Sequence, residues 1–409
     1  MSTIYPPSSP VERERFLYAD LSRFPAEIFQ FDPRMASGWL SDRYFVRAAH
    51  TLAHAGRDPV VTLQLFAKTP GTLVGVWESI RMLQTQLAAG YDVADLQVDT
   101  LLEGERFEPW ETVMHIRGPY RAFAHLETDI LGVLARRTKV ASQTRAVADA
   151  AGGRPIIFMP ARHDDWRVQV ADGYAALRGG AASVSTDANG AWWGTEGVGT
   201  MPHALIAAFG GDTVEATLAF ARYCRDREPG VKIVSLVDFD NDVIRTSIAV
   251  ARAMEREFGR GALDAVRVDT SERLIDKGLI DDPEAWGKEN LNGVNPTLVL
   301  RLRAALDEAG YPEVGIVVSG GFDVEKIGEF ESLGLPVAAY GVGSSLIVGS
   351  HDFTADVVEA DGRPVSKVGR RYIPNPRLLR VDWDRLAAAD AETAAKFADA
   401  GGKVERLER

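Results

Sequence analysis

The sequence is poor in cysteine, in net positive charge and in long apolar runs. Cys224 is the one cysteine among 409 residues, which rules out a disulfide within the chain and a zinc site built on several cysteines. We interpret Cys224 as a buried, inert thiol in a reducing compartment. The net charge of −12 argues against an extended basic surface for nucleic acid. No apolar run approaches the length of a membrane span, so we expect a soluble, cytoplasmic protein with neither nucleic acid nor membrane as a partner.

The remaining composition is that of a globular protein, with 46% hydrophobic and 25% charged residues, and the length indicates two or three domains. Residues 1–35 are proline-rich and predict an arm with limited structure of its own. Residues 36–152 mix short strands with helices and predict a mixed α/β domain. Residues 350–409 return to a hairpin pattern with an Asp-Gly turn, and we expect them to pair with that domain.

Between these parts, residues 153–349 alternate short apolar runs with amphipathic helices. A series of this kind is typical of parallel strands in an incomplete α/β barrel of about seven strands. The runs that we interpret as strands are 155–161, 181–186, 203–209, 232–238, 263–269, 315–321 and 337–343.

The last two runs end in bare backbone, Ser319-Gly320-Gly321 and Gly341-Val342-Gly343. Consecutive N–H groups without side chains in the way can close around a phosphate at the next helix. Two such turns on neighbouring strands predict a phosphate site at the carboxyl end of the barrel. The alternative is a pair of tight turns in which glycine only permits a positive φ.

Other strand ends carry polar side chains. Arg162 follows the first run, Asp238 and Asp269 close the fourth and fifth, and His203 follows a glycine-rich loop. This set suits an anionic substrate, Mg²⁺ and a phosphorylated sugar, because carboxylates hold Mg²⁺ and arginine takes a carboxylate in bidentate fashion. The alternatives stay open: a surface ion pair for Arg162, helix caps for the two aspartates, and a packed core histidine for His203.

Several segments then resemble one known family. GTMPHALI, RVDTSE, SGGFDVEKI and AYGVGSSL in the barrel region are similar to motifs of the nicotinate phosphoribosyltransferases, which are related to the quinolinate phosphoribosyltransferases. SDRYFVRA, IRGPYRAFAHLET and DFTADVVEADGRPVSKVGR agree as well, so the resemblance covers about Gly38 to Arg371. It implies an incomplete α/β barrel joined to a mixed α/β domain. It also implies transfer of phosphoribose from phosphoribosyl pyrophosphate to nicotinate, with Mg²⁺ and with ATP as co-substrate.

The resemblance further implies roles for individual residues. His203 matches a phosphorylated histidine that couples ATP hydrolysis, and Asp238 and Asp269 match acidic positions that hold ribose hydroxyls and the metal. The positions expected to bind substrate are Tyr44, Arg162, Thr200 and Arg267. The positions expected to bind the 5-phosphate are Ser319, Gly320, Gly321, Gly341 and Gly343.

Three functions remain open from the sequence. The first is a nicotinate phosphoribosyltransferase, and the second is a quinolinate phosphoribosyltransferase that decarboxylates its product, with further cations from Arg136, Arg137 and Lys139. The third is a non-catalytic relative that binds a nucleotide. Trp192 and Trp193 either stack on an aromatic substrate or, as we prefer, pack their own loop. The family resemblance also implies a homodimer or a larger homo-oligomer.

Overall fold

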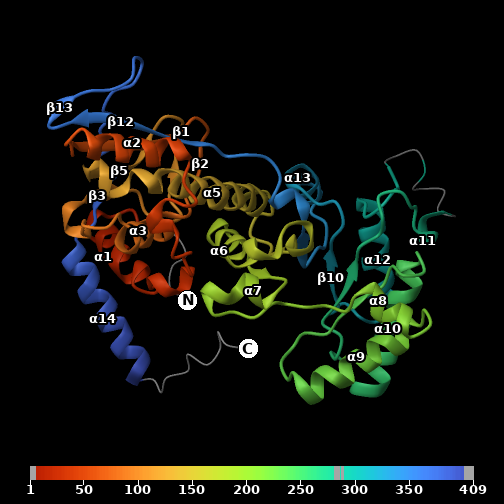
Figure 1. Ribbon diagram of the computed structural model, residues 1–409. Helices are drawn as coiled ribbons and strands as arrows, with labels where there is room; N and C mark the ends of the chain where they lie inside the picture. The colour runs from red at the N-terminus through yellow and green to blue at the C-terminus, as the bar shows by residue number, and fades with distance from the viewer. Residues whose placement is uncertain (1–5, 281–285, 287–289, 400–409) are drawn as a thin grey trace. The chain divides into compact units, whose positions relative to one another are not determined.

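The computed structural model describes residues 6–280, 286 and 290–399. The chain divides into two compact units, Met1–Ser142 with Gly349–Arg409, and Gln143–Val348. No helix in the described part of the chain combines the length and the apolar character that crossing a membrane requires. The expected fold class, an incomplete α/β barrel and a mixed α/β domain, is confirmed (Figure 1).

The first unit is built on an antiparallel sheet in the order β13-β12-β1-β5-β3-β14. Strand β12 comes from the far end of the chain and pairs with β1, with Leu63 opposite Val357 (Figure 1). The strands of this unit are β1 (Val60–Ala67), β2 (Gly71–Thr72), β3 (Gln97–Thr100), β4 (Arg106–Phe107), β5 (Thr112–Pro119), β12 (Phe353–Ala360), β13 (Arg363–Pro364) and β14 (Leu379–Arg380). Its helices are α1 (Pro10–Leu21), α2 (Arg43–His54), α3 (Val76–Thr85), α4 (Tyr120–Phe123) and α14 (Trp383–Asp399). The division between the two units falls within helix α5 (Glu127–Ala150).

The prediction of a poorly structured N-terminal arm is wrong for residues 10–21. Pro10 opens helix α1, a favourable first position for proline, and Ser9 caps it. Leu17 and Leu21 are fully buried, so the helix is held by packing rather than by its own propensity. The main-chain oxygen of Leu21 accepts a hydrogen bond from the buried Arg81 of α3. Because Arg81 is far from Leu21 in sequence, the local sequence does not predict this contact.

The second unit is a curled parallel sheet in the order β7-β6-β11-β10-β9-β8, with every adjacent pair parallel. One residue from each of five strands enters a common apolar cluster, made of Ile157, Val234, Ala265, Val317 and Ala339. The strands are β6 (Ile156–Phe158), β7 (Ser183–Val184), β8 (Val234–Leu236), β9 (Ala265–Val268), β10 (Gly315–Val318) and β11 (Ala339–Val342).

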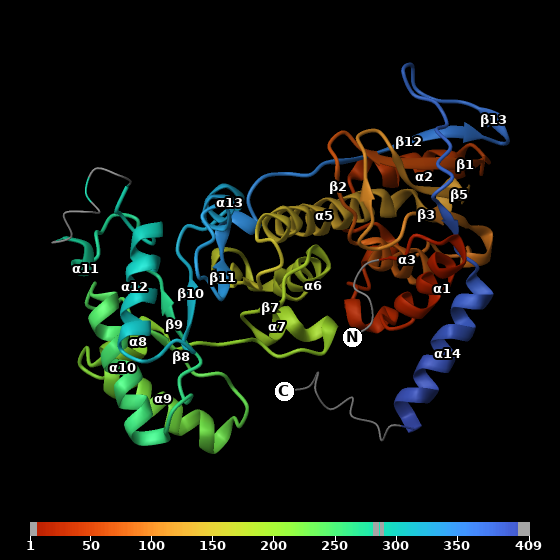
Figure 2. The same cartoon turned by 180° about the vertical axis from the view of Figure 1, so that it is seen from behind.

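Helices separate most of these strands, and α10 packs beside both α9 and α12 (Figures 1 and 2). Cys224 lies buried on α9, as predicted, and burial raises the pKa of its thiol. The helices of the second unit are α6 (Gln169–Gly179), α7 (Asp187–Gly190), α8 (His203–Ala208), α9 (Thr213–Arg227), α10 (Val243–Phe258), α11 (Lys277–Ile280), α12 (Pro296–Glu308) and α13 (Val324–Ser332).

The run 203–209, which we interpreted as a strand, is instead mostly helix α8. Only Ile206 of this helix is buried, where it packs with Met201, Ala216 and Leu236. A strand inside a parallel sheet would bury both faces, whereas this segment has one face to bury and is rich in alanine and leucine, which favour helix. The described residues therefore form six parallel strands, and β7 and β8 are the edges of the sheet.

Candidate active site

A cavity of about 350 Å³ lies in the second unit, where the segments after β6, β9, β10 and β11 meet. These are the carboxyl ends of neighbouring parallel strands, where α/β barrels place their reactive groups. The residues that line it are Met159, Arg162, His163, Arg267, Asp269, Ser319, Gly320, Gly321, Phe322, Asp323, Gly341, Gly343, Ser344, Ser345 and Val348.

Both glycine turns require glycine for steric reasons. Gly320 and Gly321 have φ values of 86° and 69°, in the left-handed region that other residues rarely adopt. A Cβ on Gly320 would also lie 3.1 Å from Asp269 Oδ1, and one on Gly341 would lie 2.7 Å from Met159 Sδ. A side chain at Gly320 or Gly341 would therefore collide with its neighbours, and both turns present their backbone to the cavity.

A hydrogen bond joins the two turns. The hydroxyl of Ser345 donates to the main-chain oxygen of Phe322 at 2.8 Å. The Phe322 ring packs against Phe330 at 5.0 Å between centroids, below the first turn. The two turns thus form one fixed wall of the cavity.

The guanidinium of Arg267 organises the residues next to the first turn. It donates to Ser319 Oγ at 2.9 Å, to Thr200 Oγ1 at 3.0 Å and to Asp269 Oδ2 at 3.1 Å. Ser319 Oγ in turn donates to Asp269 Oδ1 at 2.8 Å. Both oxygens of Asp269 are therefore fixed by the protein, and its carboxylate holds one orientation.

His203 and Asp238 form a separate pair, with His203 Nε2 at 3.1 Å from Asp238 Oδ1. His203 is the first residue of α8, and its side chain is 46% exposed whereas that of Asp238 is 6% exposed. Burial raises the pKa of the Asp238 carboxyl, His203 opposes this rise, and the charge of Asp269 adds to it. This electrostatic coupling links the pair to the cavity, although neither His203 nor Asp238 lines it.

The donor set suits a Mg²⁺ ion only in part. Asp238 and Asp269 repel each other, as the pKa shift of Asp238 indicates, and a divalent cation would relieve that repulsion. No group of three or more metal-ligating side chains occurs among the described residues. The two aspartates therefore fit an ion that takes its other ligands from phosphate oxygens and water, as Mg²⁺ commonly does.

The structure brings together most of the residues that the sequence singled out. Arg162, Arg267, Asp269 and both glycine turns share the cavity, and Thr200 contacts Arg267. Tyr44 belongs to α2 of the first unit and is 61% exposed, and its contact with substrate stays a prediction.

Trp192 and Trp193 pack on Tyr174 of α6, with ring centroids 5.5 and 5.6 Å apart. The guanidinium carbon of Arg178 lies 5.0 Å from the centroid of the Trp193 ring. The preferred interpretation, in which these tryptophans pack their own loop, agrees with these contacts.

Sequence reasoning did not select Met159, Phe322 or Asp323, which also line the cavity. Met159 lies within the predicted run 155–161, and Phe322 and Asp323 follow the run 315–321 by one and two residues. Position near a strand end was therefore a usable signal, but the apolar side chains of Met159 and Phe322 gave no chemical reason to choose them, and Asp323 has the sequence context of a helix cap.

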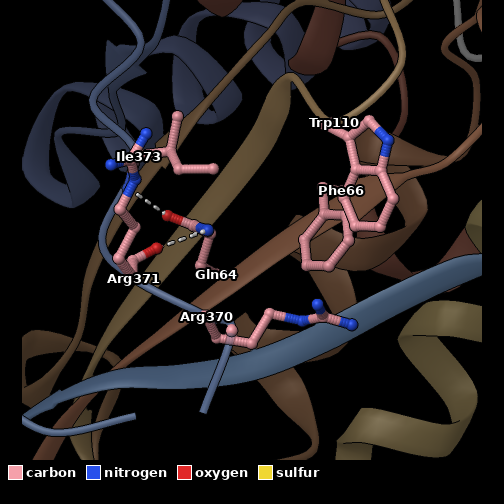
Figure 3. A pocket seen from close by; sticks show the side chains of 7 residues that line it. Gln64, Phe66, Trp110, Arg370, Arg371 and Ile373 are labelled. Atoms are coloured by element: carbon pink, nitrogen blue, oxygen red, sulfur yellow. Dashed lines mark hydrogen bonds between the residues drawn. The ribbon is translucent and has the colours of Figure 1, made fainter. Parts of the chain in front are cut away.

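A second cavity, of about 400 Å³, lies in the first unit (Figure 3). The rings of Phe66 and Trp110 stack at 5.4 Å, and Arg370 approaches both while its Nε donates to Asp356 at 2.6 Å. Gln64 lies on the opposite side, bonded to the main chain of the segment that follows β13 (Figure 3). These contacts hold that segment on the sheet.

Comparison with known proteins agrees with this geometry. Residues 42–138 match the family model described as quinolinate phosphoribosyl transferase, N-terminal domain. The chain is 34% identical over 279 residues to nicotinate phosphoribosyltransferase pncB1 of Mycobacterium tuberculosis (strain H37Rv), which covers 66% of this chain and 55% of the relative. It is 22% identical over 277 residues to nicotinate phosphoribosyltransferase of Bacillus subtilis, 66% of this chain and 50% of that protein. The chain thus spans about half the length of the curated relatives that it matches.

Solved structures of similar fold include two enzymes. The nicotinate-nucleotide pyrophosphorylase of Pyrococcus furiosus superposes with a TM-score of 0.71 at 28% identity, over 87% of this chain and 85% of that one. Human nicotinic acid phosphoribosyltransferase superposes with a TM-score of 0.59 at 20% identity, over 80% and 75%, and supports the fold alone.

Proposed function

Because the chain belongs to the nicotinate phosphoribosyltransferase family, we propose that it transfers phosphoribose from phosphoribosyl pyrophosphate to nicotinate in NAD salvage. The products are nicotinate mononucleotide and pyrophosphate. One observation carries the proposal: a single cavity combines Arg162, two bare glycine turns and the fixed carboxylate of Asp269. An acidic ring, a sugar phosphate and a ribose need those three elements side by side.

Arg162 is the group that binds the acceptor. Within the residues that the structure describes, it makes no ion pair or hydrogen bond, so its guanidinium is available for a carboxylate in bidentate geometry. Its acidic neighbours are already engaged, since Asp164 Oδ1 accepts from the N–H of Asp165 at 2.7 Å and Asp165 pairs with Arg167 at 2.7 Å. Neither contact involves Arg162, whose side chain lines the cavity.

In the reaction the pyridine nitrogen forms a bond to C1 of the ribose while the bond from C1 to the pyrophosphate oxygen breaks. The glycine turns hold the 5-phosphate through backbone N–H groups. Asp269, fixed by Arg267 and Ser319, binds ribose hydroxyls next to the carbon that gains positive charge, which stabilises that charge. Mg²⁺, held by Asp238 and Asp269 when bound, supplies positive charge to the departing pyrophosphate.

The proposal includes ATP as co-substrate, with His203 as the residue that becomes phosphorylated. The phosphoryl group passes from ATP to an imidazole nitrogen, releasing ADP, and is later hydrolysed. The exposed edge of His203 and its contact with Asp238 support this role, because a carboxylate that bonds one ring nitrogen orients the imidazole and leaves the other nitrogen to accept the phosphoryl group. A cytoplasmic location and a homodimer belong to the same proposal, and sedimentation analysis tests the second.

A quinolinate phosphoribosyltransferase is the second candidate, favoured by the family model over residues 42–138. A second carboxylate would need a second available cation. Arg267 is engaged by three side chains, and Arg137, a cation before the barrel, pairs with Glu78 at 3.1 Å. Neither Arg267 nor Arg137 is therefore available for a second carboxylate, and at these two positions the contacts support the acceptor with one carboxylate.

One assay separates the candidates. The purified protein is incubated with phosphoribosyl pyrophosphate, Mg²⁺ and either nicotinate or quinolinate, with and without ATP. We expect mononucleotide from nicotinate and stimulation by ATP, and we expect His203→Ala to lose the stimulation while keeping slow transfer. Release of CO₂ from quinolinate would identify the second candidate, and no product from either acceptor would indicate a non-catalytic binding protein.

A further inference from the structure

His163 occupies a position for which the proposed reaction has so far given no role. It ends the short 3₁₀ helix Ala161–His163 that follows β6, and its side chain lines the cavity. A Cβ placed on Gly343 would lie 3.2 Å from His163 Cε1 and 3.7 Å from His163 Nδ1. The imidazole therefore lies against the backbone of the second glycine turn.

The imidazole of His163 has no polar contact with another residue in the described part of the chain. Its main-chain N–H donates to Pro160 O at 2.7 Å, but neither ring nitrogen makes a hydrogen bond or an ion pair with a described residue. In the free protein, water can bond to the nitrogens of an exposed imidazole, and a ligand can replace that water. Here the residue is exposed on the cavity side of the turn.

The second glycine turn also lacks a charged partner for a phosphate. Its backbone offers neutral N–H donors, and Ser344 offers a hydroxyl, yet a phosphate monoester carries nearly two negative charges. Of the other basic side chains that line the cavity, Arg267 is engaged by Thr200, Ser319 and Asp269. Arg162 is assigned to the acceptor carboxylate, which leaves His163.

The acidic groups on the same wall do not compete for this imidazole. Asp323 caps α13 by accepting from the N–H of Lys326 at 2.9 Å, and both oxygens of Asp269 are bonded to protein donors. A ring N–H of His163 is thus free to donate to an incoming anion.

We propose that His163 completes a phosphate subsite at the second glycine turn, donating a ring N–H to a phosphate oxygen of a phosphorylated pentose. The identity of the sugar rests on the proposed function, whereas the phosphate subsite rests on the position of His163 beside Gly343. His163 is a binding residue in this assignment, because it contacts the phosphate and not the carbon at which the reaction occurs.

Calorimetric titration of the full chain tests the subsite directly. Ribose 5-phosphate and ribose are titrated into wild type, His163→Ala, His163→Gln and His163→Lys. A charge-assisted hydrogen bond corresponds to about 10-fold or more in affinity, so we expect His163→Ala to weaken ribose 5-phosphate by that factor. Lysine should restore most of the affinity and glutamine only part of it, while binding of ribose should be the same in all four proteins.

The matched control is His54→Ala, the same change at an exposed position of α2, which should bind ribose 5-phosphate as wild type does. Equal ribose 5-phosphate affinity in His163→Ala and wild type would overturn the inference. So would weakened nicotinate binding with unchanged phosphate binding, or no binding of ribose 5-phosphate to wild type.

The titration also separates this inference from the proposed function. If wild type fails to use nicotinate but binds ribose 5-phosphate in a His163-dependent manner, the subsite stands and the acceptor is wrong. If nicotinate is used but His163 makes no difference to phosphate binding, the function stands and the subsite is wrong.

Discussion

Arg267 contacts side chains from three separate segments: the loop before α8, the end of β9 and the end of β10. Its donors are directed at Thr200, Asp269 and Ser319, so the guanidinium fixes the site as well as carrying charge. The substrate contact expected for Arg267 stays a prediction. A ligand that reached it would have to share donors already used by the protein, which favours a positioning role.

Arg162 provides the clearest test at the scale of a single residue. Arg162→Ala should raise KM for nicotinate by about 10- to 100-fold, because a bidentate charged contact is lost, while kcat changes little. Steady-state kinetics with each substrate varied in turn measure both quantities. An unchanged KM for nicotinate would remove Arg162 from the acceptor site, and an equal rise in KM for phosphoribosyl pyrophosphate would move it to the other substrate.

Among the elements, the first glycine turn is the more constrained of the two proposed phosphate-binding turns, because Gly320 and Gly321 both have positive φ values. Gly320→Ala forces a Cβ into a left-handed residue, at 3.1 Å from Asp269 Oδ1. We expect KM for phosphoribosyl pyrophosphate to rise by about 10-fold and the free energy of unfolding to fall by about 1–2 kcal/mol.

The matched control for that change is Gly328→Ala in α13. Gly328 has no atom within 4 Å of its Cβ position, so alanine should stabilise the helix by about 0.5–1 kcal/mol and leave the kinetics unchanged. Similar kinetics in Gly320→Ala and Gly328→Ala would contradict a phosphate role for the turn.

Strand β1 holds the C-terminal segment through one buried side chain (Figure 3). Gln64 is 1% exposed. Its side-chain amide nitrogen donates to Arg371 O at 3.3 Å, and its side-chain oxygen accepts from the N–H of Ile373 at 2.7 Å. His115 Nε2 lies 3.2 Å from the same oxygen of Gln64. Gln64→Leu removes these bonds and leaves the buried ring of His115 without this partner, and it should lower the free energy of unfolding by about 1–3 kcal/mol.

Urea unfolding measures the effect, with Gln97→Leu on β3 as the control. The amide of Gln97 bonds to Asp99 on the same strand at 3.0 Å, and the change there should cost about 0.5 kcal/mol or less. A loss in Gln64→Leu no larger than in Gln97→Leu would show that the segment is held by its other contacts.

For the whole molecule, the pH dependence of stability is set in part by Glu127 in the first unit. Burial raises the pKa of this carboxyl to about 8 from its ordinary value of 4.5, and the charges of Asp356 and Asp42 add to the rise. Between these two values the folded protein holds a proton that the unfolded chain releases. The contribution of that proton to the free energy of unfolding is completely present below about pH 4.5 and is lost as the pH rises through about 8.

We therefore expect the free energy of unfolding to fall between pH 5 and pH 8, by up to about 1.4 kcal/mol per pH unit from this group. Glu127→Gln should flatten that slope, and Glu325→Gln at an exposed position of α13 should leave it unchanged. Chemical denaturation at several pH values gives the comparison. A slope equal to that of wild type in Glu127→Gln would exclude Glu127 as its source.

The sequence by itself determined the features that depend on local composition and period. Short apolar runs closed by glycine predicted the strands ending near Ser319 and Val342. A parallel strand that is buried on both faces is apolar along its whole length, so its sequence is recognisable without knowledge of its neighbours. The polar residues after those runs predicted which side chains gather in one cavity, since the carboxyl ends of parallel strands share an edge.

Only the tertiary structure decided the rest. Residues 203–208 are apolar enough for a strand, and they form α8 because the packing leaves them one face to bury. Helix α1 depends on Arg81 of a distant helix, and the place of His163 depends on Gly343, about 180 residues further along the chain. Such contacts join residues far apart in sequence, so no local pattern encodes them, and their energies exist only once the chain has folded.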